Sequence, residues 1–182
     1  MKRRLLFLAV LALAVGGLLT PSGVLASGLG PAYLHVSSFS AGLLNPNLAN
    51  LSVSTGSSIP RQPDAYILAN PVVGIAWADL DSGKVFVVTI HPVLGRDSHQ
   101  DPDSWHAHTA TLAGGASAPN DFCVASIDST PTAGIQIHGN QLDVNVRSDA
   151  LPVAPSAFDA AVGFTIQPDS ACASSLAVRV VS

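Results

Sequence analysis

Glutamate is missing from this chain, and lysine and methionine are nearly so. The sequence has 182 residues, and aspartate alone makes up its 12 acidic residues. After the first few residues Lys84 is the only lysine, and Met1 is the only methionine. The residues that usually cover helix surfaces are therefore scarce, whereas Val, Thr, Ser, Ile and Gly abound. This composition predicts an all-β protein.

Other absences exclude several kinds of active site. There is no G-x-S-x-G elbow, no glycine-rich phosphate loop and no H-E-x-x-H motif. A glycosidase would need a pair of aspartates, and nothing in the sequence marks one. A blue-copper centre is excluded because no cysteine is followed closely by a histidine and Met1 is the only methionine. We therefore assign no catalytic residue and favour a protein without catalysis.

The N-terminal region has the features of a secretory signal peptide. Basic residues 2–4 precede an apolar run from Leu5 to Leu19, and Val24-Leu25-Ala26 provides a cleavage site. The run is shorter than the ~20 residues of a membrane-spanning helix, and no cysteine follows Ala26 to carry a lipid. We expect residues 1–26 to be removed and the mature chain to be secreted or extracytoplasmic, in a periplasm or at a cell surface.

The mature chain, from Ser27 to Ser182, is acidic. It loses three of the eight basic residues and keeps all 12 acidic ones, so its formal charge falls from −4 to −7. Such a charge argues against nucleic acid or an anionic membrane as a partner. The sequence leaves an extracellular ligand or protein as the expected partner and does not identify it.

Two cysteines, Cys123 and Cys172, remain in a chain predicted to be exported. An even number of cysteines in an oxidising compartment predicts one disulfide, here between the starts of strands expected at 122–127 and 172–181. The alternative, a pair of metal-binding thiolates, is disfavoured by the wide spacing.

The strand pattern predicts an antiparallel β-sandwich of the Ig-like or Greek-key type, with about nine or ten short strands in one domain over residues 64–182. A short strand is expected at 65–68. Asp81-Ser82-Gly83 predicts a hairpin between strands at 72–80 and 84–90. Residues 85–90 are apolar on both sides, as in a strand central to a sandwich. A Gly139-Asn140 turn predicts the pairing of 135–138 with 141–147, with every apolar residue on one face.

Two segments carry other expectations. Residues 27–63 are rich in Ser, Asn, Gly and Pro, so we expect a loosely structured lead-in with one strand at 33–39. Ser156 to Asp159 has the spacing of a helix cap, which predicts a short crossover helix near 156–162.

Four of the six histidines, His91, His99, His106 and His108, lie between positions 91 and 108. On a strand, His106 and His108 share one face and lie roughly 6.5–7 Å apart along the chain. If 84–91 pairs antiparallel with 105–112, His91 becomes a neighbour of His106. Two or three neutral imidazoles in this arrangement predict a site for Zn²⁺ or Cu²⁺.

Several alternatives stay open. Two histidines on one strand face also arise from ordinary packing, and Asp97, Asp101 and Asp103 could form a solvated loop or a calcium site. The H-x-H pair resembles copper/zinc superoxide dismutases over three residues, but their later zinc-loop histidines are missing and no family is identified. The sequence thus supports a binding or structural module without catalysis or, alternatively, a zinc- or copper-binding metalloprotein.

The signal peptide supplies the first testable prediction. We expect N-terminal sequencing of the exported protein to begin near Ser27, because Val24-Leu25-Ala26 is the only cleavage site after the apolar run. The exported protein should also remain in solution without detergent. An exported form that begins at Met1 would contradict this prediction.

Overall fold

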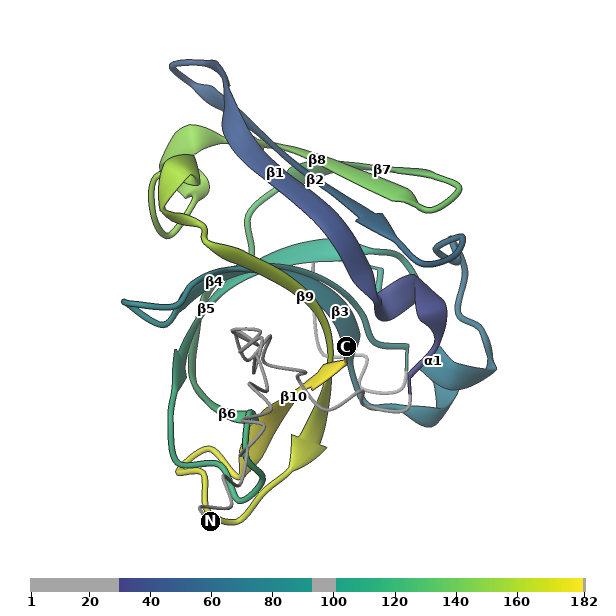
Figure 1. The fold of residues 1–182 in the computed structure, drawn as a ribbon, viewed down its shortest axis with the longest axis vertical. Helices are drawn as coiled ribbons and strands as arrows, with labels where there is room; N and C mark the ends of the chain where they lie inside the picture. The colour runs from purple at the N-terminus through teal and green to yellow at the C-terminus, as the bar shows by residue number, and fades with distance from the viewer. Residues whose placement is uncertain (1–29, 93–100, 182) are drawn as a thin grey trace, which may run out of the picture.

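Ten antiparallel strands in two sheets make up most of the molecule, which we describe from a computed structural model covering residues 30–92 and 101–181 (Figure 1). The predicted all-β fold with two packed sheets is confirmed. Among the described residues, no helix has the length and apolar character needed to cross a membrane. The predicted signal peptide, residues 1–26, and His99 lie outside the described residues.

The strands and helices follow one another along the chain with short connections. In order they are η1 (Ala32–Leu34), β1 (Val36–Asn45), β2 (Leu48–Thr55), α1 (Ala65–Ala69), β3 (Val73–Asp79), β4 (Lys84–Ile90), β5 (His106–Ala113), β6 (Phe122–Ser129), β7 (Ala133–His138), β8 (Gln141–Arg147), η2 (Ser148–Ala150), η3 (Pro155–Ala157), β9 (Ala160–Pro168) and β10 (Leu176–Val181).

The first sheet has four strands in the order β1-β2-β8-β7. Its last hairpin has the predicted register, with His138 opposite Gln141 and Ile137 opposite Leu142. Along β2, partly and fully buried residues alternate strictly, because one face of the sheet packs against the rest of the molecule. This sheet covers one side of the other sheet (Figure 1).

The second sheet closes into a six-stranded barrel in the order β10-β6-β5-β4-β3-β9. This closure is the main feature of the fold that the sandwich prediction did not contain. The predicted hairpin between β3 and β4 is present, and Gly83 in its turn has a φ of 68°. A side chain at Gly83 would also meet the carbonyl oxygen of Leu112, so glycine is required there on both counts.

Strands β3 and β4 form a wall between two apolar cores. Trp77 and Phe86, which are register partners, are fully buried on the outer face of the barrel, against the four-stranded sheet. The alternate residues of the same strands, such as Ala76 and Val87, belong to the second core, inside the barrel. Because strand residues alternate between faces, β3 and β4 are apolar on both sides, as the sequence of β4 predicted.

The structure corrects three local predictions. The lead-in before Pro63 contains two long strands, β1 and β2, instead of the one expected. They pair with each other along nearly their whole length. Residues Ala65–Ala69 form a helix, not a strand, since the side chain of Asp64 accepts a hydrogen bond from the Ile67 amide and caps it. The crossover near 156–162 is only a 3₁₀ turn, Pro155–Ala157, after which β9 begins.

Cys123 and Cys172 form the predicted disulfide, with their Cα atoms 5.2 Å apart. It lies at the shortest seam of the barrel, where β10 and β6 pair only through Ala177 with Cys123 and Val178 with Phe122. The disulfide therefore adds a covalent link where the hydrogen-bonded closure is weakest. Its presence in a buried position indicates an oxidising, extracytoplasmic environment.

A polar cluster on the barrel surface links β4, β5 and β6. The carboxylate of Asp128 accepts hydrogen bonds from Ser126, from Thr111 at 2.8 Å and from the Lys84 ammonium group at 3.0 Å. The hydrogen bond from Ser126, followed by those from Lys84 and Thr111, lowers the pKa of Asp128 to about 2. The cluster holds together the strands that carry the histidines.

Loss of the disulfide should weaken the fold. The two cysteines are 49 residues apart, and the chain-entropy model assigns closure of such a loop up to about 4 kcal/mol. We expect Cys123→Ala/Cys172→Ala to lower the free energy of unfolding in urea by up to that amount. Wild-type protein treated with reductant is the matched control and should behave like the variant. Two free thiols in denatured, unreduced protein would contradict the assignment.

The Asp128 cluster should make stability depend on pH. A folded pKa of about 2 lies below the unfolded value of about 3.9, so the cluster stabilises the fold above about pH 4 and loses this effect as the pH falls toward 2. We expect Asp128→Asn to be less stable than wild type at pH 7, with the difference shrinking at pH 2. Urea denaturation at both pH values measures it, with Asp81→Asn as the control on a nearby turn. A carboxyl signal of Asp128 that titrates near pH 4 by NMR would contradict this prediction.

Candidate metal site

Strands β4 and β5 bring three histidines together. The two strands pair antiparallel as predicted, with Thr89 opposite His106 and Val87 opposite His108. His91 follows β4 directly, and its backbone amide donates a hydrogen bond to the Pro102 carbonyl at 3.1 Å. That bond holds the end of β4 against the segment that leads into β5, so His91 lies beside His106.

The side chains of these histidines point into the barrel. On β5, His106 and His108 share a face with Ala110, which belongs to the interior core, whereas Ala107 belongs to the outer one. Relative exposures of only 6% for His91, 3% for His106 and 8% for His108 show that all three are buried. Three titratable rings thus lie in a barrel interior whose described residues are mostly apolar.

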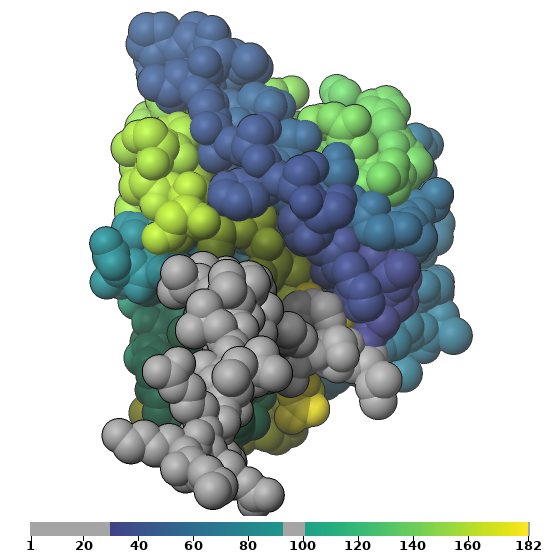
Figure 2. All heavy atoms as spheres, in the orientation of Figure 1, coloured from purple at the N-terminus to yellow at the C-terminus, as the bar shows by residue number. Residues whose placement is uncertain are grey.

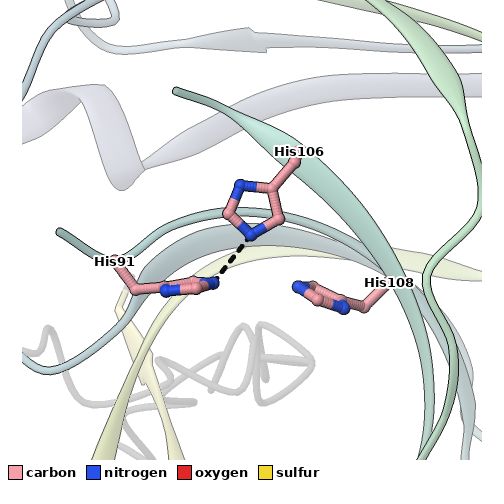
Figure 3. Close-up of side chains that lie close together, drawn as sticks. All are labelled: His91, His106 and His108. Atoms are coloured by element: carbon pink, nitrogen blue, oxygen red, sulfur yellow. Dashed lines mark hydrogen bonds between the residues drawn. The ribbon is translucent and has the colours of Figure 1, made fainter. Parts of the chain in front are cut away.

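The three rings converge on one another (Figure 3). The Nε2 atoms of His91 and His106 are 2.7 Å apart and share a hydrogen bond. The ring centroids of His106 and His108 are 5.0 Å apart, and one nitrogen from each histidine lies within 4.8 Å of the other two. In the described parts of the chain, this is the only group of three or more such side chains close enough to hold a metal ion.

Neighbouring oxygen atoms orient two of the rings. The Nδ1 atom of His106 lies 2.7 Å from the carbonyl oxygen of Ser104. Because a carbonyl only accepts hydrogen bonds, Nδ1 carries the proton, and in the neutral ring Nε2 presents its lone pair to the cluster. The Nδ1 atom of His108 similarly contacts the Thr130 hydroxyl at 3.1 Å. Metal-binding histidines are commonly held in this way, through the ring nitrogen that does not bind the metal.

The spacing of the nitrogens is close to that of a tetrahedral metal site. With metal–nitrogen distances of about 2.0–2.1 Å, two ligands of a tetrahedral zinc ion lie roughly 3.3 Å apart. The His91–His106 separation of 2.7 Å is shorter, and the full set fits within 4.8 Å. Small side-chain rotations would therefore admit an ion, which would replace the hydrogen bond between His91 and His106.

The other predicted site residues have different outcomes. His99 and Asp97 lie outside the described residues. Asp101 forms a turn, because its carboxylate accepts hydrogen bonds from the Asp103 amide at 3.0 Å and the Ser104 hydroxyl at 3.1 Å. Neither Asp101 nor Asp103 joins the histidine group. Metal binding by His91, His106 and His108 stays a prediction.

Comparison with protein-family models, with curated proteins and with solved structures finds no match to this chain. Its function therefore has to be argued from its own residues.

A cavity of about 490 Å³ lies inside the barrel and reaches the histidines. His91 and His108 line it at the end of the barrel where β4 ends and β5 begins, together with Thr89. The rest of the lining is almost entirely apolar, with side chains such as Val85, Phe164 and Val178. A second cavity, of about 690 Å³, lies toward the opposite end, near the β3–β4 turn.

Sequence analysis missed the residues that surround the histidines. Thr89 lies two residues before His91 and so shares its face, which strand periodicity alone could have shown. Ser104 acts through its backbone carbonyl, and Thr130 lies beyond the end of β6. The Ser104 contact is local, two residues from His106, and the Thr130 contact depends on the register of β5 with β6, which the sequence analysis did not predict.

Proposed function

We propose that this protein is an exported metal-binding module that holds one Zn²⁺ or Cu²⁺ ion through His91, His106 and His108. One observation carries the proposal: three buried histidines from facing strands place a ring nitrogen each within 4.8 Å of one another. A ligand set made only of imidazoles suits zinc and copper(II), whereas calcium and magnesium prefer oxygen ligands.

The orientation of the rings supports a metal over simple packing. Packing alone would explain the hydrogen bond between His91 and His106. The third ring, His108, is held with its Nδ1 on Thr130 and its other edge toward the pair. The described residues thus supply three inward-facing nitrogens, the number of protein ligands at zinc sites whose fourth position takes water or another molecule.

The disulfide and the predicted signal peptide both support export of the protein. The buried disulfide is consistent with an oxidising environment. A signal peptide over residues 1–26 would deliver the chain to a periplasm, a cell surface or the surrounding medium. We assign no catalytic step, and an extracellular ligand or protein is the expected partner.

A protein-contact module without metal is the second candidate. Nearly all of β1 is exposed, and it lies at an edge of the four-stranded sheet. The end of the β1–β2 hairpin projects from the molecule (Figure 2), and Leu43 and Leu44 there have relative exposures of 57% and 62%. An exposed edge strand with apolar side chains can pair with another chain.

Metal titration separates the two candidates. We expect calorimetry to show that wild type binds one Zn²⁺ or Cu²⁺ per chain, and that His106→Ala/His108→Ala does not, because it removes two of three ligands. The matched control is His138→Ala, which removes an exposed histidine at the tip of the β7–β8 hairpin and should bind like wild type. Equal, weak binding by wild type and the double variant would instead leave the protein-contact module as the better function.

Bound metal should also stabilise the fold. A ligand that binds only the folded state adds about 2.7 kcal/mol at a concentration 100 times its dissociation constant. We therefore expect the melting temperature of wild type and His138→Ala to rise by several degrees with metal, and that of His106→Ala/His108→Ala to stay unchanged. A melting temperature of wild type that does not respond to metal would contradict the site.

A further inference from the structure

We infer that the barrel cavity beneath the histidines binds a small hydrophobic carboxylate whose head group completes the coordination of the metal. This inference rests on the proposed metal site and adds the class of molecule that the site would take. It is carried by three features of the cavity: its apolar lining, the unpaired hydroxyl group of Thr89, and the absence of charged side chains among the described residues that line it.

The shape and lining of the cavity suit an apolar body. Its volume of about 490 Å³ is in the range of pockets that bind small molecules. Side chains from all six barrel strands surround it, mostly Val, Ala, Leu, Ile and Phe. Besides Gln167, the polar residues of the lining are His91, His108 and Thr89, which lie where β4 ends and β5 begins, so a bound molecule would place its polar group there and its apolar part below.

The hydroxyl group of Thr89 is a buried polar atom that lacks a partner. Thr89 has a relative exposure of 3%, and its Oγ1 atom has no hydrogen-bond partner among the described residues. An unsatisfied buried hydroxyl costs free energy in the absence of a ligand. Because Thr89 lines the cavity and is the register partner of His106, its hydroxyl is placed to donate to a group bound beside the metal.

The charge of the site favours an anion. Three neutral imidazoles leave a divalent ion with a charge of +2 in an apolar interior, where unbalanced charge is costly. No Asp, Lys or Arg is among the described residues that line this cavity. A carboxylate would reduce the net charge to +1, with one oxygen bound to the metal and the other accepting a hydrogen bond from Thr89.

The test uses exported wild-type protein loaded with Zn²⁺ and a series of saturated monocarboxylates from acetate to decanoate. We expect affinity measured by calorimetry to rise about fourfold for each added methylene group until the cavity is filled. Metal-free protein should bind decanoate at least tenfold more weakly. Acetate has almost no apolar chain, so its affinity measures binding of the carboxylate to the metal without a contribution from the apolar cavity.

Two variants test the named features while sparing the metal ligands. Thr89→Val should weaken decanoate binding about tenfold, the effect expected for a hydrogen bond to a charged group, and should retain zinc affinity. The matched control is Thr165→Val on β9. Thr165 is also buried, but it does not line the cavity, whereas its neighbours Phe164 and Ile166 do. Ala76→Phe, on β3 and two strands away from His108 in register, should fill the cavity and abolish the dependence on chain length.

The outcomes separate this inference from the metal site. Zinc-loaded protein that binds no decanoate, or binds acetate and decanoate equally, would overturn the inference and leave the metal site standing. Decanoate binding that is equal with and without zinc, or unchanged in Thr89→Val, would also overturn it. Failure of wild type to bind zinc at all would overturn the metal site and this inference together.

Discussion

Burial on both faces of β3, β4 and β5 is the constraint on which the rest of this structure depends. These strands separate the core beneath the four-stranded sheet from the interior of the barrel. A strand of this kind has no face available for water, so each side chain must pack or find a polar partner inside. Histidines at inward positions of β5 therefore interact with other buried side chains and with the nearby backbone.

The two cores differ in how completely they are filled. On the outer face, Trp77, Phe86 and the residues of β2 and β8 pack closely, and the largest fully buried side chains lie there. Inside the barrel, mostly smaller side chains such as Ala76, Val87 and Ala110 leave cavities at both ends. A barrel of six strands thus has rigid outer support and space within. A binding site needs both properties, because its ligands must be held in place by their surroundings.

The barrel is held closed by connections of unequal strength. Most neighbouring strands pair along six or more residues, as β3 does with β4, but β10 and β6 share a short seam. The disulfide between Cys123 and Cys172 reinforces that seam. The histidines lie where β4 and β5 pair at length, and the disulfide secures a different part of the barrel wall, the short pairing of β10 with β6.

Strand periodicity and composition were enough to predict the all-β class, the hairpins at Gly83 and at Gly139-Asn140, the pairing of β4 with β5 and the disulfide, because each depends on local spacing or on residue type. The convergence of His91 on His106 followed from that pairing. Only the tertiary structure decided that the second sheet closes. Closure depends on two pairings between strands far apart in sequence, β10 with β6 and β9 with β3, and β9 also pairs with β10. Closure also placed the Thr89 hydroxyl and the cavity inside the barrel, and the register of β5 with β6 set the Thr130 contact. None of these is a property of a single strand, and so no pattern along the chain could show them.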